Sequence, residues 1–232
     1  RIVLFNDLPG YGKVALAAMV PLFSRMGHFP YQVPTAVVSN TLDFGKFRIQ
    51  DMTDYMRDTI KVWDELGFDP DCICTGFVLS EEQVELIGDY IRSRKPRIDA
   101  IENVNNGRLV MVDPIMADGG KLYNGIGMER VAAMRKLVSY SDVMVPNMTE
   151  AGFLTGICPG RERASASELR KLVDGLHKLS GKSVVITSAQ DSETDEHQPS
   201  CQTFSAATFR WTAATCSYCP CGGYQSQADF GR

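Results

Sequence analysis

The sequence lacks two features that would each indicate a particular class of protein. It has no excess of positive charge, since 24 Lys and Arg stand against 28 Asp and Glu for a formal net charge of −4. Binding to nucleic-acid phosphates draws on clustered Lys and Arg, so we expect no nucleic-acid partner. The longest apolar stretch, residues 14–23, is interrupted by Pro21 and is far shorter than the roughly 20 residues that span a bilayer. We therefore expect no membrane partner either.

Targeting signals and cysteines are also scarce over most of the chain. No secretory signal is visible, because Arg1 leads directly into the apolar residues 2–5. The absence of an initiator Met indicates a trimmed or incomplete start. Only Cys72, Cys74 and Cys158 lie before residue 200, which is typical of a protein from a reducing compartment. We expect a cytoplasmic protein.

Short β-rich runs alternate with helical periodicity up to about residue 188. With 44% hydrophobic and 22% charged residues, the chain has enough apolar side chains for one substantial core. Strands are predicted at residues 2–5, 33–39, 72–75, 109–112, 142–145 and 183–187, and helices at residues 13–26, 51–66, 80–93, 126–138, 147–155 and 166–179. This alternation predicts a three-layer α/β/α fold with a mainly parallel central sheet. In such sheets ligands bind beyond the carboxyl ends of the strands.

A glycine-containing loop follows the first predicted strand. Its spacing, Gly10 and Gly12 with Ala15 in place of a third glycine, matches a loosened dinucleotide-binding fingerprint. The second predicted strand ends without an acidic residue for a ribose, which weighs against that function. Lys13 is not followed by Ser or Thr, so the loop is not a P-loop. A glycine turn into a helix is the simpler interpretation.

Carboxylate and amide side chains follow two further strands. Asp113 and Asp118 come after the fourth predicted strand, and both are hard oxygen ligands that suit a hydrated Mg²⁺. The alternative is that they cap the following turn. Asn147 and Glu150 come after the fifth strand at the spacing of a helix capping box. The functional interpretation is that they face the same crevice as Asp113 and complete a phosphate–Mg²⁺ site.

Several motifs together resemble a known family. Three of them follow one another in the order and approximate spacing of the ribokinase-like superfamily, and four others narrow the resemblance to the pyridoxal (pyridoxine, pyridoxamine) kinases. The first three are Asp-Pro-Ile-Met-Ala-Asp at 113–118, Val-Pro-Asn-Met-Thr-Glu at 145–150 and Val-Val-Ile-Thr-Ser at 184–188; the others are Ser-Asn-Thr at 39–41, Phe-Gly-Lys-Phe at 44–47, the opening residues 6–12 and Thr-Gly-Phe at 75–77. The resemblance covers roughly residues 2–190.

The resemblance implies a ribokinase-like fold and transfer of the γ-phosphoryl group of ATP to the 5′-hydroxymethyl group of a B6 vitamer. It implies Mg²⁺, often with a monovalent cation, and a homodimer. By position it implies vitamer contacts at Asp7, Tyr11, Thr41, Leu42, Asp43 and Phe77. It implies ATP contacts at Asp113, Val145, Asn147, Glu150, Thr187 and Ser188, and metal ligands at Asp113, Asp118 and Glu150.

Four of these positions depart from the family pattern. Asp7 stands where the family usually has a Ser that contacts the pyridine ring, and Leu42 and Asp43 stand where a Thr-Gln or Thr-Gly pair lines the pocket. Val145 stands where a Thr or Ala usually precedes Pro-Asn. The departures leave open a different vitamer preference, or a neighbouring kinase of hydroxymethylpyrimidine or a sugar.

Residues 191–232 do not continue the pattern. The family carries a late Gly-Thr-Gly-Asp motif that supplies both backbone N–H groups for the γ-phosphate and the catalytic base, and this sequence has none. Asp229 is a weak candidate base, because no glycine-rich helix start precedes it. We divide the chain into a truncated kinase domain, 1–190, whose fold is incomplete at its C-terminal part, and an atypical Cys-rich tail, 191–232.

Two hypotheses account for the tail. A zinc site at Cys201, Cys216, Cys219 and Cys221 has poorly placed ligand pairs and no nearby His. We favour a tail that is translated out of frame, because a shift by two bases near residues 210–217 permits Asp-Gly-Gly-Asp, similar to the lost motif. If the tail is native, the alternative is a catalytically inactive nucleotide-binding homologue, with apolar surface exposed on one side of the sheet and low stability.

Overall fold

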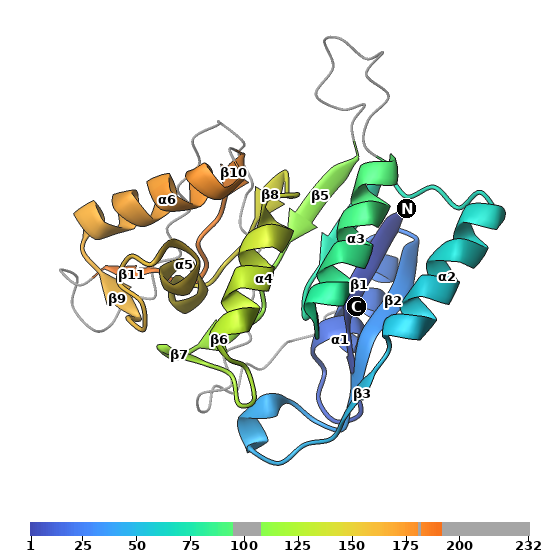
Figure 1. Cartoon of the computed structure of the whole chain (residues 1–232), viewed down its shortest axis with the longest axis horizontal. Coiled ribbons are helices and arrows are strands. Elements are labelled where there is room, and N and C mark those ends of the chain that lie inside the picture. The colour runs from blue at the N-terminus through green and yellow to red at the C-terminus, as the bar shows by residue number, and fades with distance from the viewer. Residues whose placement is uncertain (95–107, 181, 192–232) are drawn as a thin grey trace, which may run out of the picture.

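The computed structural model describes residues 1–94, 108–180 and 182–191, and its elements are labelled in Figure 1. The strands are β1 (Ile2–Pro9), β2 (Pro30–Val38), β3 (Ile49–Asp51), β4 (Cys72–Thr75), β5 (Leu109–Val112), β6 (Ala117–Asp118), β7 (Lys121–Leu122), β8 (Val143–Met144), β9 (Arg163–Ala164), β10 (Ser183–Val184) and β11 (Gln190–Asp191). The helices are α1 (Ala15–Arg25), α2 (Thr53–Glu65), α3 (Glu81–Arg94), α4 (Met128–Val138), α5 (Met148–Thr155) and α6 (Ala166–Ser180), with a 3₁₀ turn at Leu42–Phe44.

A seven-stranded sheet in the order β10-β8-β5-β4-β1-β2-β3 forms the centre of the molecule. Its neighbouring strands are parallel except for the edge pair β2 and β3, which is antiparallel. Two small sheets, β6 with β7 and β9 with β11, lie outside it. The mainly parallel α/β fold expected from the sequence is therefore confirmed.

The two faces of the sheet are covered by different helices. Along β1, Val3 and Phe5 face the larger core, which they share with residues of α2 to α6, while Ile2 and Leu4 face α1. Phe5 meets Tyr90 of α3 edge to face, with ring centroids 5.2 Å apart. Alternation along a strand sends successive side chains to opposite faces, so both faces of β1 are apolar and buried. Helices on both faces give the three layers that the sequence predicted.

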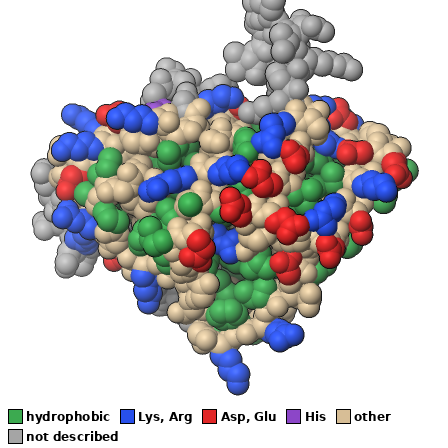
Figure 2. All heavy atoms as spheres, viewed as in Figure 1, with side chains coloured by type: hydrophobic (Ala, Val, Ile, Leu, Met, Phe, Trp, Pro, Cys, Tyr) green, Lys and Arg blue, Asp and Glu red, His purple; other side chains and the backbone are tan. Residues whose placement is uncertain are grey.

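Charged side chains of both signs are interspersed over the outer face of α2, α3 and α4 (Figure 2). Ion pairs join neighbouring helices there, such as Arg57 with Glu82 and Lys136 with Glu85. Among the described residues, no helix is both long and apolar enough to cross a membrane.

The structure adds elements that the sequence patterns did not predict. Five short strands of two or three residues were not predicted, namely β3, β6, β7, β9 and β11. Each forms only because it pairs with another strand, which is either distant in sequence or part of an irregular loop. Helices generally begin one or two residues later than predicted, as in α1 and α4. Residues 192–232, including Asp229 and the four late cysteines, lie outside the described part of the chain.

Candidate functional site

A pocket of about 240 Å³ opens beyond the carboxyl ends of β1, β2 and β4. We call it the β1 pocket. It is lined by Asp7, Val14, Ala15, Val38, Asn40, Thr41, Leu42, Phe77, Ile115 and Tyr123. Four of the six vitamer contacts implied by the resemblance are among them, namely Asp7, Thr41, Leu42 and Phe77. The fold therefore gathers into one cavity residues from three separate strand ends.

Asn6 of β1 holds two of the residues that line the β1 pocket. Its side chain is buried, and its Oδ1 accepts hydrogen bonds from the backbone N–H of Asp7 at 3.0 Å and of Phe77 at 2.8 Å. The backbone of Gly76 passes so close that a Cβ there would lie 2.4 Å from Asn6 Nδ2. A single side chain of β1 thus positions two pocket residues, Asp7 within β1 and Phe77 after β4.

Asp7 is the one carboxylate among the described side chains that line the β1 pocket. Burial raises the pKa of Asp7 to about 6, because loss of solvent disfavours the charged form. Thr35, beneath the pocket, donates from its hydroxyl to the Phe77 carbonyl at 2.6 Å. The pocket therefore combines an ionisable group with apolar walls and a firmly held aromatic residue.

The other two implied vitamer contacts are placed differently. Tyr11 is exposed at 67% and packs edge to face against Phe44, with ring centroids 6.0 Å apart, so it stands outside the pocket lining. Asp43 belongs to the 3₁₀ turn, and its side chain lies outside what the structure describes. The glycine loop makes a turn against β2, since Gly10 N–H donates to the Val38 carbonyl at 2.7 Å.

A second group of predicted residues meets where the 113–118 loop touches the start of α5. We call residues 113–118 and 147–150 the α5 junction. Asn147 caps α5, and both bonds of its capping box with Glu150 are formed at 2.9 Å. Asn147 also donates from Nδ2 to the Ala117 carbonyl at 2.7 Å, and Glu150 Oε1 accepts from the Met116 N–H at 3.1 Å. The capping interpretation of Asn147 and Glu150 is therefore confirmed, and the same side chains also hold the 113–118 loop.

The carboxyl groups of the α5 junction have unusual proton affinities. Burial raises the pKa of Asp113 to about 7. Burial and the neighbouring charge of Asp113 raise the pKa of Glu150 to about 8, against the opposing effect of its backbone hydrogen bonds. Two nearby carboxyl groups that resist ionisation are expected where a cation is to bind, although a structural network shifts pKa values as well.

The predicted metal ligands do not form a three-carboxylate cluster. Within the residues that the structure describes, no group of three His, Cys, Asp or Glu side chains is arranged to hold a metal ion. Asp118 is exposed and accepts from the Gly119 N–H at 2.9 Å, the turn-capping arrangement considered as the alternative. Both oxygens of Glu150 already accept backbone hydrogen bonds. Asp113, partly exposed, is the member of the set that best suits a hydrated Mg²⁺.

The remaining predicted ATP contacts follow neighbouring strands at the same edge of the sheet. Val145 N–H donates to the Val112 carbonyl at 3.0 Å and Thr187 N–H to the Pro146 carbonyl at 2.9 Å. Thr187 bridges to Asn147, and Ser188 adopts a left-handed backbone conformation with φ of 56°. Since Asn147 belongs to the α5 junction, its bridge to Thr187 places the segment that follows β10 beside that junction.

Sequence reasoning missed several residues of the β1 pocket. Tyr123, which follows β7, belongs to no motif and reaches the pocket only through the tertiary fold. Ile115 lies inside the recognised 113–118 motif, two residues after Asp113, so its position was a usable signal. Asn40 likewise lies inside the 39–41 motif, where its Nδ2 donates to the carbonyls of Thr41 and Lys46.

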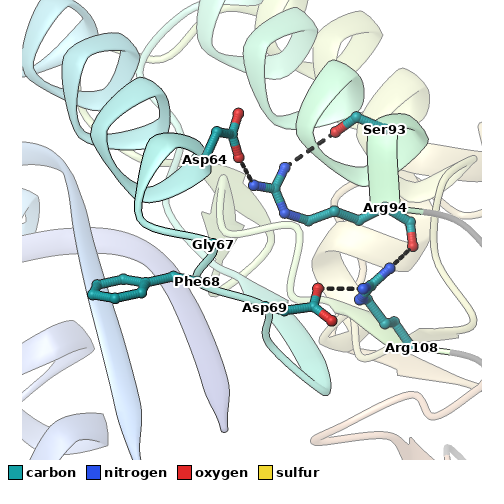
Figure 3. A pocket seen from close by; sticks show the side chains of 7 residues that line it. All are labelled: Asp64, Gly67, Phe68, Asp69, Ser93, Arg94 and Arg108. Atoms are coloured by element: carbon teal, nitrogen blue, oxygen red, sulfur yellow. Dashed lines mark hydrogen bonds and ion pairs between the residues drawn. The ribbon is translucent and has the colours of Figure 1, made fainter.

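A larger cavity of about 400 Å³ lies away from these strand ends, between the C-terminal parts of α2 and α3 (Figure 3). It is lined by Asp64, Gly67, Phe68, Asp69, Ser93, Arg94 and Arg108. Each guanidinium there has a carboxylate partner, Arg94 with Asp64 and Arg108 with Asp69. Because its charges are already paired, this cavity is a weaker candidate than the β1 pocket.

Known proteins share both the sequence and the fold. A pyridoxine/pyridoxal/pyridoxamine kinase of Bordetella avium is 31% identical over 190 residues, which are 79% of this chain and 59% of that protein. A Bacteroides thetaiotaomicron protein described as a phosphomethylpyrimidine kinase, crystallised with pyridoxal, is 31% identical with a TM-score of 0.72 over 85% of this chain and 64% of its own. Pyridoxal kinase from Lactobacillus plantarum is 25% identical with a TM-score of 0.71 over 90% of this chain and 73% of its own.

The chain thus spans 59% of the length of the Bordetella relative. The model of the phosphomethylpyrimidine kinase family matches residues 17–216, which are most of the chain. That range contains both the α5 junction and most of the β1 pocket. The chain belongs to the phosphomethylpyrimidine kinase family.

Proposed function

We propose that this chain is part of a kinase that transfers the γ-phosphoryl group of ATP to the 5′-hydroxymethyl group of pyridoxal, pyridoxine or pyridoxamine. The observation that carries the proposal is that one loop serves both regions. Ile115 lines the β1 pocket, while Asp113 and the Met116 N–H belong to the α5 junction. A small aromatic alcohol in the pocket would therefore lie beside a nucleotide bound at the junction.

The β1 pocket suits the vitamer. Its volume of about 240 Å³ fits a single substituted ring rather than a dinucleotide. Phe77, Val38 and Ile115 offer apolar surface to the ring, while Asp7 and Thr41 offer polar groups to its substituents. Pyridoxal accompanies the Bacteroides structure, whose fold this chain shares.

The α5 junction suits the nucleotide with Mg²⁺. Asp113 would hold the hydrated ion, and Glu150, whose two oxygens accept backbone hydrogen bonds, would fix the loop that presents Asp113. When bound, Mg²⁺ would neutralise phosphate charge, which phosphoryl transfer needs more than covalent help from the protein. Thr187 and Ser188 would lie near the phosphates. The monovalent cation has no ligands assigned to it and stays a prediction.

We assign no catalytic base: Asp229 and the rest of the tail lie outside the described residues. The division into a kinase domain, 1–190, and an atypical tail, 191–232, is part of the proposal. So are the homodimer and a cytoplasmic location. The latter agrees with the free thiols of Cys72, Cys74 and Cys158. Multi-angle light scattering of the purified chain tests the dimer.

Binding and turnover test the function separately. We expect the full chain to bind pyridoxal and ATP–Mg²⁺ in calorimetric titrations, and to bind hydroxymethylpyrimidine less tightly. The Asp113→Asn variant should lose ATP–Mg²⁺ affinity and keep pyridoxal affinity, whereas Asp58→Asn, on the exposed side of α2, should change neither.

Phosphorylation of pyridoxal is then followed by phosphorus NMR. Turnover supports the complete proposal, and binding of both ligands without turnover indicates an inactive homologue. A chain that prefers hydroxymethylpyrimidine, or that binds no vitamer, would contradict the proposed substrate.

A further inference from the structure

Asp7 stands at an irregular point of the sheet. The pairing of β1 with β2 shifts register between Asn6 and Leu8, so the residue between them is released from regular pairing. Register shifts of this kind re-aim a side chain and are common beside functional sites. Its backbone N–H is held by Asn6 Oδ1 at 3.0 Å, and its carboxylate lines the β1 pocket.

The carboxylate of Asp7 faces no positive charge. Within the described part of the chain no Lys, Arg or His forms an ion pair with it, and burial is the main influence on its proton affinity. The pocket walls come from the β1–α1 loop, the ends of β2 and β4, and the loops after β5 and β7. Among the described residues of that lining, Tyr123 is the titratable side chain besides Asp7, and Lys13 stands exposed outside it.

A partly buried carboxylate without a counterion is unfavourable in the empty pocket and is relieved by a ligand that brings a proton donor or a positive charge. We infer that Asp7 is the specificity-determining residue of the β1 pocket, accepting a hydrogen bond from a ring nitrogen that carries a proton and so selecting the protonated heteroaromatic form over a neutral ring of the same shape. This inference rests on the proposed function and specifies which form of the vitamer the site takes.

Protonation of Asp7 should weaken the binding of the protonated ring at acidic pH. The pKa of Asp7 is raised to about 6, so the carboxylate is ionised at pH 7 and becomes protonated as the pH falls through 6. Affinity for the protonated ring then falls below pH 6, approaching about tenfold per pH unit, because only the ionised carboxylate accepts that hydrogen bond.

Calorimetric titration of the full chain with two probes tests the inference. The probes are pyridoxine and its carbocyclic analogue, in which a ring C–H replaces the nitrogen. At pH 7 we expect the wild-type chain to prefer pyridoxine by about tenfold to hundredfold, the range expected for a hydrogen bond to a charged group. The Asp7→Asn variant should reduce that preference to a few-fold and lose the decline below pH 6. The control Asp58→Asn removes the same charge from an exposed site and should behave as the wild type.

The Asp7→Ser variant provides a second test, with a smaller neutral group at the same position, and circular dichroism verifies that each variant is folded. If wild-type and variant chains bind pyridoxine with the same preference and the same pH profile, the inference is wrong and the proposed function stands. If the wild-type chain binds the two probes equally, the inference is likewise wrong. If it binds neither, both the inference and the proposed function fail.

Discussion

The β1 pocket and the α5 junction lie at the same edge of one sheet, yet they treat their polar groups in opposite ways. At the junction Asn147 and Glu150 make hydrogen bonds to one another and to the 113–118 loop. In the pocket Asp7 is a carboxylate without an ion-pair partner among the described residues. The difference shows that polar motifs of the same kind can either hold the fold together or recognise a ligand. The hydrogen-bond partners of a residue indicate its role better than the residue type does.

The Glu150→Ala variant tests the structural role of the α5 junction, and we expect it to have the largest effect on stability. It removes the acceptor of two backbone N–H groups, those of Met116 and Asn147, at a buried site. We expect a loss of about 3 kcal/mol in the free energy of unfolding, measured by urea denaturation, since each unsatisfied buried donor costs about 1–3 kcal/mol.

The Glu150→Gln variant keeps one acceptor oxygen and should lose less. The control Glu65→Ala, at the exposed end of α2, should lose almost nothing. Equal stability of Glu150→Ala and Glu65→Ala would show that the junction is not a scaffold.

The Gly76→Ala variant tests the β1 pocket, because it should disturb the residues that form it. The added Cβ would stand 2.4–2.6 Å from three atoms of the buried Asn6 side chain, which holds Asp7 and Phe77 by hydrogen bonds. Overpacking of this kind costs about 2 kcal/mol, and pyridoxal affinity should fall with it.

The matched control is Gly127→Ala, whose Cβ would meet the movable carboxylate of Glu129. It should cost less in urea denaturation and leave pyridoxal binding unchanged. Wild-type affinity in Gly76→Ala would contradict the role of Asn6 in positioning Asp7 and Phe77.

The pH dependence of stability would sharpen the comparison. Because burial raises the folded-state pKa of Asp113 to about 7, its contribution to stability is fully present below its unfolded pKa, near 4, and is lost as the pH rises through 7. We expect the free energy of unfolding to fall by about 1 kcal/mol between pH 5.5 and 7.5, allowing for the partial exposure of the group.

The Asp113→Asn variant should flatten this dependence in urea denaturation series at the two pH values. Glu150, with its pKa raised to about 8, acts in the same direction and should keep part of the slope. A slope of the opposite sign in the wild type would refute the assignment.

Backbone strain offers the smallest expected effect. Ala15 lines the β1 pocket with φ of 48°, in the left-handed region that favours glycine. Ala15→Gly should raise the free energy of unfolding by about 0.5–1 kcal/mol, seen as a higher thermal midpoint. Ala18→Gly, within regular α1, should lower it by a similar amount. Loss of stability in both variants would show that the pocket stores no strain at Ala15.

Local patterns predicted the parts of the fold that depend on near neighbours in sequence. Periodicity located α2 and α6 within two residues, and the spacing of Asn147 and Glu150 predicted a capping box that the structure contains. The same patterns missed β3 and the small sheets, because two or three residues carry too little periodicity and because β9 pairs with β11, which is distant in sequence. The motifs found Asp7 and Phe77, but Tyr123 needed the fold.

The sequence by itself determined the layered α/β fold, the family resemblance and the residues that follow each strand, because these depend on periodicity and short motifs. Only the tertiary structure decided what each of those residues does. In the folded chain Tyr11 lies on the surface and Asp118 caps a turn. Asp113 is partly exposed, and the neighbouring Glu150 is hydrogen-bonded to the backbone. Hydrogen-bond partners and burial are properties of three-dimensional neighbours, and a carboxylate acquires its role from them.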